Sequence, residues 1–315
     1  MKKLNKISFL VCAMGLGFGQ LKAQLNPNSS NFMFNPIAVN PAMAGLHTNQ
    51  VQLGFEAQWL GLEGAPKTGY LRYDKLFNEN SGWNFAIISD HIGPISSITL
   101  SNAFGYHFKT TEKTFASLGL RHNLSQHYLS LSSQKINDVN DPLLAGDLNS
   151  VPVNNFDAGA TFYNPESFLV GFSYRNIIPQ RRFRGNEVTE VPVISLHGWY
   201  TREINNDFSI EAIGQFNTSP NTPINSQFAV MGTYQQMFGA GLNFSPKNQM
   251  GIFAYIKTKD KINFFYNYNL PISDIFQVSK QSHAIGISYR FGKDQNLYNT
   301  FFIQPTDGAS GNRLF

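Results

Sequence analysis

The histidines are the side chains of this 315-residue chain best suited to bind a metal or act as a general base. No two of them stand four residues apart and none lies in an HExxH-like pattern. The closest pair, His122 and His127, has an odd separation, which places the two rings on opposite faces of a strand. A metal shared by this pair is therefore not expected, and we predict structural roles for all seven: His47, His91, His107, His122, His127, His197 and His283.

Other patterns that would support catalysis are absent from the sequence. There is no GxSxG motif, no Walker A motif and no dinucleotide-binding glycine pattern. The single cysteine, Cys12, lies in an N-terminal apolar run, so the rest of the chain has no disulfide and no cysteine-based zinc or redox site. We therefore predict no enzymatic activity, no cofactor and no catalytic or metal-binding residue. The enzymatic alternative is a Ser or Asp nucleophile oriented by a histidine on a neighbouring strand.

A basic cluster, Arg181-Arg182-Phe183-Arg184, could bind acidic sugars or lipopolysaccharide phosphate. It lies in a long connection between two predicted strands. We favour the simpler interpretation, in which the cluster belongs to a solvated loop.

The first 23 residues have the layout of a secretory signal peptide. Lys2, Lys3 and Lys6 precede an apolar run over residues 7–18, and Ala23 offers a small residue at the cleavage point. The run is too short and glycine-rich for a membrane-spanning helix, which needs about 20 apolar residues. We predict that residues 1–23 are removed and that the mature chain starts at Gln24.

Removal of this segment changes the charge of the protein. The segment holds four lysines and no acids, so Lys+Arg falls from 24 to 20 against 20 Asp+Glu. The mature chain is then neutral, and the basic patch that a nucleic-acid partner would require is missing. No nucleic-acid partner is expected.

Composition and periodicity both favour β structure. Charged and aromatic residues each make up 14% of the chain, with 28 Phe and 13 Tyr. In the first long segment, Val51, Leu53 and Phe55 alternate with polar or small residues, and a period of two places each set on its own face of a strand. The same pattern recurs over residues 51–59, 67–76, 82–91, 96–108, 113–133, 154–163, 167–176, 191–200, 207–216, 226–234, 237–245, 249–257, 261–270 and 282–291.

The connections predict a transmembrane outer-membrane β-barrel of about 14 antiparallel strands. Short turns such as Thr258-Lys259-Asp260 alternate with long connections over residues 134–153, 177–190, 217–225 and 271–281, so the long ones share one side. Splitting residues 113–133 at Arg121-His122-Asn123 would add a strand and scatter the long connections over both sides. We therefore predict one long fifth strand.

The charged residues support a barrel with a polar lumen, because they fall opposite the apolar face of their strands. They are Glu56, Arg72, Asp74, Asp90, Asp157, Arg175, Glu211 and Arg290. The alternative, a soluble β-sandwich, usually has strands of about five or six residues, whereas these run near the length of a tilted bilayer span. Trp59, Trp83 and Trp199 are assigned to an interfacial girdle.

An even strand number places both ends of the barrel on the periplasmic side of a Gram-negative outer membrane. The predicted organisation is then a signal peptide over 1–23, a periplasmic leader or plug segment over 24–49, the transmembrane barrel over 50–291 and a periplasmic C-terminal tail over 292–315.

The leader combines apolar residues with two Asn-Pro pairs, in the run Asn31-Phe32-Met33-Phe34-Asn35-Pro36-Ile37-Ala38-Val39-Asn40-Pro41-Ala42-Met43-Ala44-Gly45. Asn before Pro favours extended or turn geometry, so we expect an ordered, non-helical strap. Its apolar side chains need cover, either in the mouth of the barrel or against a partner.

This run resembles the opening signature of the PorP/SprF family of type IX secretion outer-membrane proteins. Two further elements match: Gln58-Trp59-Leu60-Gly61-Leu62-Glu63-Gly64-Ala65-Pro66-Lys67-Thr68 is similar to the family's QWxGxxGAPxT element, and Asp90-His91-Ile92-Gly93-Pro94 to its DxIGP element. The resemblance marks Phe34, Asn35, Pro36, Asn40, Pro41, Ala42, Gly45, Gln58, Trp59, Gly61, Gly64, Ala65, Pro66, Asp90 and Gly93 as signature or partner-docking candidates.

The resemblance implies a barrel in outer-membrane lipid that works with periplasmic and outer-membrane components of type IX secretion or gliding. It would escort or anchor a large secreted cell-surface protein and dock periplasmic partners through its leader and tail. The alternative is a passive channel or porin, since a barrel of this size could enclose an aqueous lumen.

Overall fold

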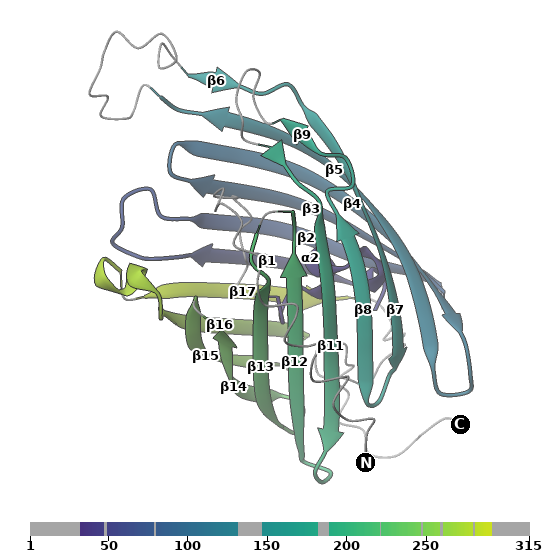
Figure 1. The fold of residues 1–315 in the computed structure, drawn as a ribbon. Helices are drawn as coiled ribbons and strands as arrows, with labels where there is room; N and C mark the ends of the chain where they lie inside the picture. Colours follow the sequence, from purple (N-terminus) through teal and green to yellow (C-terminus); the bar gives the residue numbers. More distant parts are fainter. Residues whose placement is uncertain are drawn as a thin grey trace, which may run out of the picture.

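Fourteen antiparallel strands close into a barrel in the computed structural model, which describes residues 32–46, 49–78, 80–131, 147–181, 189–220, 222–246, 248–258, 261–279 and 281–291 (Figure 1). The wall strands are β1 (Gln50–Ala57), β2 (Lys67–Asn78), β3 (Ser81–Ile92), β4 (Ile95–Lys109), β5 (Phe115–Leu129), β7 (Val153–Asn164), β8 (Phe168–Arg175), β11 (Val193–Glu203), β12 (Phe208–Thr218), β13 (Asn225–Tyr234), β14 (Phe238–Ser245), β15 (Gln249–Lys257), β16 (Ile262–Pro271) and β17 (Ser282–Arg290). The pairing of β1 with β17, from Gln50 opposite Arg290 to Ala57 opposite His283, closes the ring. The predicted fold class is confirmed.

Several short elements decorate this wall. β6 (Leu148–Asn149) pairs with the end of β5, and β9 (Gln180–Arg181) pairs with β10 (Thr189–Glu190) inside the connection between β8 and β11. A 3₁₀ turn, η4 (Asp274–Gln277), lies between β16 and β17. None of these pieces was predicted, because two to four residues carry too little periodicity to be recognised in the sequence.

The alternation along each strand separates a polar lumen from an apolar outer face. In β1, Glu56 is 4% exposed whereas its neighbour Phe55 is 49% exposed, which is the reverse of a soluble protein. The charged residues assigned to the lumen by their register do face inward; Asp90 and Arg175 are half-buried and the other six are buried. Apolar side chains outside and polar side chains inside suit a wall surrounded by lipid.

One assignment of the aromatic girdle is wrong. Trp199 lies on the inward face of β11, is only 8% exposed and packs edge-to-face on His197 at 5.5 Å. Alternation along β11 places it in the lumen, next to the core described below. A tryptophan near the end of a strand therefore does not by itself mark the membrane interface.

The connections lie as their lengths predicted. Strand β5 runs unbroken from Phe115 to Leu129. The long connections after β5, β8, β12 and β16 share one side, here called the long-connection side, and the opposite side carries short turns. The described wall begins and ends on the short-turn side, where Phe291 N–H donates to the Asn49 carbonyl at 3.0 Å.

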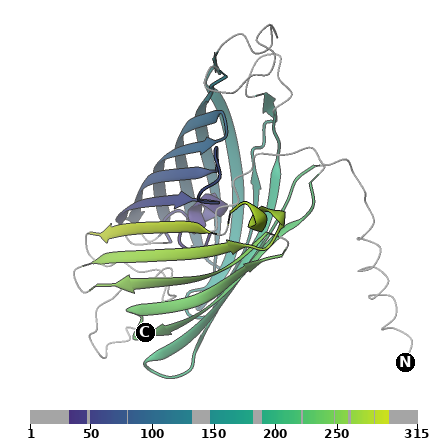
Figure 2. The same cartoon turned by 90° about the vertical axis from the view of Figure 1, so that its left-hand side faces the viewer.

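The hydrophobic core of the molecule lies inside the barrel. Residues 32–46, here called the lumen plug, occupy the lumen as two short turns, α2 (Pro36–Val39) and η2 (Pro41–Met43) (Figure 2). The core side chains come from both the plug and the wall: Phe32, Met33, Ile37, Val39, Met43, Ala44 and Leu46 meet Ala103, Tyr163, Leu169, Trp199, Ile213, Ala229, Met231, Phe253, Tyr255 and Phe265. The leader thus finds its apolar cover within its own barrel.

The plug is not the non-helical strap expected from its Asn-Pro pairs. Asn35 and Asn40 are non-helical, as residues before proline should be, but each following proline starts a helical turn. Asn40 also caps the second turn, since its Oδ1 accepts a hydrogen bond from Ala42 N–H at 2.9 Å. Proline fixes the backbone angle that the first helical residue needs, so the two pairs give turns separated by an extended asparagine.

The signal peptide, the C-terminal tail and the basic residues Arg182 and Arg184 lie outside the described residues. Within the described residues, no helix has the length and apolar character needed to cross a membrane.

Candidate functional site

The lumen plug meets the wall through buried hydrogen bonds, and Asn40 is at their centre. Its side chain is fully buried, and Nδ2 lies 3.0 Å from the Ala160 carbonyl oxygen and 3.1 Å from that of Phe172. Nε2 of His197 lies 3.2 Å from the same nitrogen, and because an amide nitrogen only donates, this ring nitrogen is the acceptor. One side chain therefore binds the plug to three wall strands, β7, β8 and β11.

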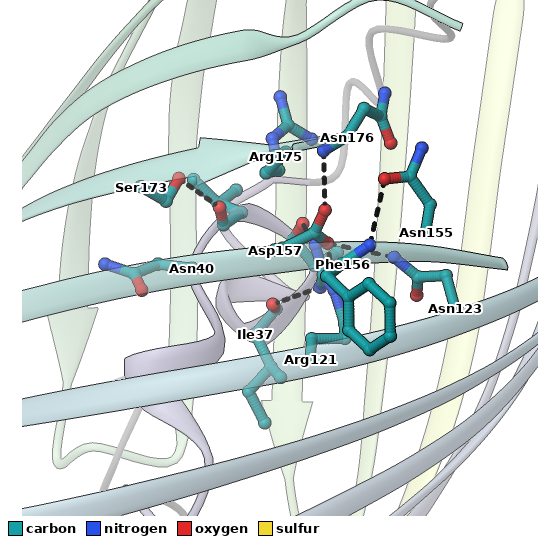
Figure 3. Close-up of polar contacts among 12 residues, drawn as sticks. Ile37, Asn40, Arg121, Asn123, Asn155, Phe156, Asp157, Ser173, Arg175 and Asn176 are labelled. Carbon is teal, nitrogen blue, oxygen red and sulfur yellow. Dashed lines mark hydrogen bonds and ion pairs between the residues drawn. The ribbon is translucent and has the colours of Figure 1, made fainter. Parts of the chain in front are cut away.

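An arginine on β5 holds the first turn of the plug. Arg121 donates from Nη1 to the Ile37 carbonyl at 2.8 Å and from Nη2 to the Ala38 carbonyl at 3.2 Å (Figure 3). Its Nε pairs with Asp157 Oδ2 at 2.5 Å, and the other carboxylate oxygen accepts from Asn176 N–H at 2.7 Å. Asp157 therefore orients Arg121, and Arg121 provides donors to the carbonyls at the end of α2.

Three further wall side chains donate to plug carbonyls. Ser173 Oγ donates to Val39 O, and Ser117 Oγ to Ala42 O, both at 2.7 Å. His107 Nε2 donates to Ala44 O at 2.7 Å, which makes Nδ1 the acceptor for the Tyr163 hydroxyl at 3.2 Å. Short helical turns leave their carbonyls without partners, and here the wall supplies the donors.

The other end of the plug lies against the opposite part of the wall. Phe34 stacks on Phe265 with ring centroids 4.3 Å apart and meets Phe253 edge-to-face at 5.7 Å. Asn35 Oδ1 accepts from Arg72 Nη1 at 2.5 Å, and Arg72 forms a buried ion pair with Asp74 at 2.9 Å. Large apolar rings and one paired arginine therefore hold this end.

A row of glycines makes room for residues 40–45 of the plug. Gly82, Gly105, Gly119 and Gly159 are direct partners across β3, β4, β5 and β7. A Cβ at any of them would lie less than 3.0 Å from an atom of the plug. These four residues, here called the glycine groove, let the backbone of the plug approach the backbone of the wall.

A polar cavity of about 270 Å³ lies beside the plug. Its lining residues Glu56, Asp90, Asn155, Arg175 and Asn217 all stand near the long-connection ends of their strands. Phe32, Ala38 and Val39 of the plug also line it. We call this space the vestibule.

The predicted signature residues gather in two places. Seven of them belong to the plug: Phe34 and Asn35, which are half-buried, and Pro36, Asn40, Pro41, Ala42 and Gly45, which are buried. The connection between β1 and β2, at the long-connection rim, contains Gln58, Trp59, Gly61, Gly64, Ala65 and Pro66. Gly93 lies on the same rim, in the turn between β3 and β4. Asp90 faces the vestibule, and Thr68 Oγ1 donates to its carboxylate at 2.6 Å.

The rim group is tied to its neighbours by backbone hydrogen bonds. Gly93 N–H donates to the Gly64 carbonyl at 2.8 Å, which joins the second and third signature elements. Leu60 N–H donates to Gln281 O at 2.8 Å, which joins the same connection to the loop before β17. Gly64 has a φ of +73° and Gly93 of +57°, a backbone region that favours glycine.

Sequence reasoning missed the wall residues that hold the plug. Arg121, Asp157, His107, Ser117 and Ser173 were assigned at most to a polar lumen, without a partner. The signal that could have found the site is the recurrence of a glycine inside neighbouring strands, because glycine in the middle of a strand often marks a close backbone approach.

Four of the seven histidines can be followed along the strands of the wall. His122 and His127 lie on opposite faces of β5, as their spacing predicted. His107 and His197 bind the plug, and His127 lies 3.2 Å from Glu190. No group of three or more His, Cys, Asp or Glu suited to a metal ion occurs among the residues that the structure describes.

A closed, even-stranded antiparallel barrel with a lipid-facing apolar surface and a polar lumen is an outer-membrane β-barrel. The structure resembles the crystal structure of the Ralstonia pickettii toluene transporter TbuX, with a TM-score of 0.50 and 11% identity over 82% of this chain and 94% of that chain. A Pseudomonas aeruginosa FadL homologue gives a TM-score of 0.48 and 12% identity over 86% and 96% of the two chains. At these identities the likeness concerns the fold alone.

The sequence also matches the family described as "Type IX secretion system membrane protein PorP/SprF" over residues 21–289. The chain belongs to this family, as its three signature elements indicated. It is thus a non-enzymatic outer-membrane barrel of the type IX secretion system. Comparison with curated protein sequences gave no significant match.

Proposed function

We propose that this protein is a plugged barrel that escorts or anchors a large secreted surface protein during type IX secretion and docks periplasmic partners through its C-terminal tail. The observation that carries the proposal is the lumen plug. A barrel whose lumen is filled by its own leader is better suited to bind protein partners than to conduct solutes.

The plug argues against the passive channel. Its apolar residues form the core of the molecule, and Arg121, Ser117, Ser173 and His107 all donate to its backbone. A segment held by this many buried contacts stays in the lumen at equilibrium. A purified barrel is therefore expected to give no stable conductance in a planar bilayer, and a stable open pore would favour the channel.

The two ends of the wall support docking on the periplasmic side. Asn49 and Phe291 meet on the short-turn side, and in outer-membrane barrels the short turns face the periplasm. The tail over residues 292–315 follows directly from this point. In the proposed arrangement the tail can reach periplasmic components while the long connections face a secreted partner outside the cell.

The test is a gentle detergent pull-down of the tagged full-length protein from its native outer membrane, followed by mass spectrometry. Recovery of a large secreted protein together with type IX components is expected. A variant lacking residues 292–315 should keep the secreted protein and lose the periplasmic components. Truncating the tail leaves the plug and β17 intact, so heat-modifiable migration on a gel should be unchanged in this variant.

Recovery of a clean monomeric barrel from both the full chain and the truncated variant would overturn the proposal. Equal recovery of periplasmic components by the two proteins would overturn the docking role of the tail alone. Protease protection in intact cells provides an independent check, because a periplasmic tail should be cleaved only after the outer membrane is opened.

A further inference from the structure

The outer face of the wall carries a polar pair where lipid is expected. Asn102 on β4 and His122 on β5 are direct partners across the two strands. Both side chains face outward, because the residues before them, Ser101 and Arg121, are buried on the inward face. Asn102 is exposed and His122 is half-buried. An amide and an imidazole therefore interrupt the apolar surface on this side of the barrel.

The pair lies within the membrane-spanning part of the wall. Strands β4 and β5 run side by side, and each has 15 residues, of which Asn102 and His122 are the eighth (Figure 1). A tilted strand crosses the bilayer in about 9–11 residues. A window of that length includes the eighth residue of a 15-residue strand wherever the window begins. The depth of the pair therefore does not depend on the exact position of the membrane.

The opposite side of the barrel is apolar. Strand β14 lies six strands from β5 in one direction around the ring and eight in the other. The outward side chains of β14 and of its neighbour β15 are all apolar: Phe238, Ala240, Leu242, Phe244, Met250, Ile252, Ala254 and Ile256. The polar pair thus distinguishes one face of the wall from the face across the barrel.

The two side chains of the pair differ in their hydrogen bonds. His122 Nε2 donates to Asn154 Oδ1 at 2.9 Å, so the imidazole has a partner on β7. Within the part of the chain that the structure describes, the Asn102 amide makes no hydrogen bond. Acyl chains cannot accept or donate one, and an unpaired amide in hydrocarbon is strongly unfavourable. Lipid alone would therefore leave Asn102 unsatisfied.

We propose that the outer face of β4 and β5 is a contact between two copies of this chain in the plane of the membrane. An asparagine amide complements itself, because it has both donors and an acceptor, so two facing Asn102 side chains form two reciprocal hydrogen bonds. A two-fold axis along the membrane normal keeps both copies in the same orientation and brings residues of equal depth together. A different protein would need a polar group at this depth, whereas a second copy has one by symmetry.

Apolar side chains around Asn102 complete the contact. Leu100 and Leu124 are partners on one side of the pair, and Phe104 and Leu120 are partners on the other. These side chains pack against the second copy while the amides bond at the centre. The inference goes beyond the proposed function, and it does not depend on the partners tested by the pull-down.

The experiment is photocross-linking in the native outer membrane, with p-benzoylphenylalanine incorporated at Leu120 of the full-length chain. Leu120 faces outward beside the pair and is 67% exposed. Two copies with different tags are expressed together, one tag is used for purification after irradiation, and the cross-linked product is probed for the other. A product with both tags is expected. The matched control is Leu242 on β14, which is 65% exposed and should give little of this product.

Asn102→Leu tests the assigned residue. It makes the face apolar, which suits a single barrel in lipid, and removes both reciprocal hydrogen bonds from the contact. The two-tag product should fall by about fivefold, since two hydrogen bonds between membrane-embedded side chains contribute roughly that factor. Asn102→Gln retains the amide and should preserve most of the product. Heat-modifiable migration verifies folding, and Asn102→Ala serves if Asn102→Leu fails to fold.

Three results would overturn the proposal. The first is no two-tag product, or equal amounts from the probes at Leu120 and Leu242, as random collisions would give. The second is a product at Leu120 that never carries the second tag, because the neighbour would then be a different protein. The third is unchanged cross-linking in the folded Asn102→Leu or Asn102→Ala variant, because the amide would then have no role in the contact.

Discussion

The two ends of the lumen plug are held by different kinds of contact. Residues 40–45 lie in the glycine groove with their backbone against the wall, and side-chain donors from β4, β5 and β8 reach their carbonyls or those beside them. Residues 32–34 instead pack by large side chains, with Phe34 between Phe253 and Phe265. The first contact depends on backbone shape and the second on apolar volume.

This difference implies different tolerances to mutation. A backbone-to-backbone contact has no rotatable group that can move aside when a side chain is added. An aromatic cluster can repack around a side chain of similar volume. We therefore expect the glycine groove to determine where the plug lies, while the aromatic end adds stability with less demand on sequence.

The largest effect is expected from removing the plug itself. Deletion of residues 32–46 removes the side chains that the plug contributes to the hydrophobic core. It also removes the hydrogen-bond acceptors of Arg121 and Arg72, whose guanidinium groups would then bind water. The wall strands keep all their pairing, so a barrel should still form and become an open pore. Planar-bilayer conductance should change from silent in the full chain to stable opening in the deletion variant.

Silence in the deletion variant, with heat-modifiable migration retained, would contradict the view that the plug closes the lumen. That result would also remove the basis for comparing its two ends.

The second effect in size concerns the glycine groove. Gly119→Val would place side-chain atoms on the backbone of Ala42, so the plug must leave its site or the wall must distort. Overpacking of this kind costs about 3 kcal/mol or more when nothing can yield. Denaturant unfolding should show the loss, and bilayer recordings should show partial opening.

The matched control is Gly232→Val on β13. Gly232 faces outward, and an added Cβ there meets nothing within 4 Å. If both variants lose the same stability, the cost would come from valine in a strand glycine position in general, and the glycine groove would have no special role.

The wall could be predicted from the sequence to within a few residues, because strand periodicity is local. Residues 249–257 and 82–91 were recognised from alternation alone, and the structure places β15 at Gln249–Lys257 and β3 at Ser81–Ile92. Short connections and an even strand number then required a closed ring. Each of these steps uses neighbours in sequence.

The candidate site could not be predicted in the same way, because its contacts join residues far apart in the chain. Asn40 meets Ala160, Phe172 and His197, over separations of 120 to 157 residues. The signature motifs pointed to Asn40 but not to its partners. Trp199 failed for a different reason: strand periodicity places it on the inward face of β11 with Ser195 and His197, and the girdle assignment relied on its place near the strand end instead.

The third effect tests the polar contacts beside the groove. Asn40→Ala removes the amide that bonds Ala160 O and Phe172 O and the cap of η2. Loss of a buried amide of this kind costs about 2 kcal/mol. The free energy of unfolding should fall by that amount, whereas Asn205→Ala in the exposed turn between β11 and β12 should change it less, since that turn is solvated.

Equal losses in the two asparagine variants would show that the plug amide is replaced by water without cost. The groove would then act through shape alone.

The smallest effect is expected at the aromatic end. Phe34→Leu keeps most of the apolar volume and loses the stacking on Phe265 at 4.3 Å, for a cost of about 1 kcal/mol. The same unfolding measurement should therefore rank this variant below Gly119→Val and Asn40→Ala, and its lumen should stay closed in a planar bilayer. A loss larger than that of Gly119→Val would reverse the comparison, because it would mean that apolar volume around Phe34, and not the close backbone approach at the glycine groove, determines where the plug lies.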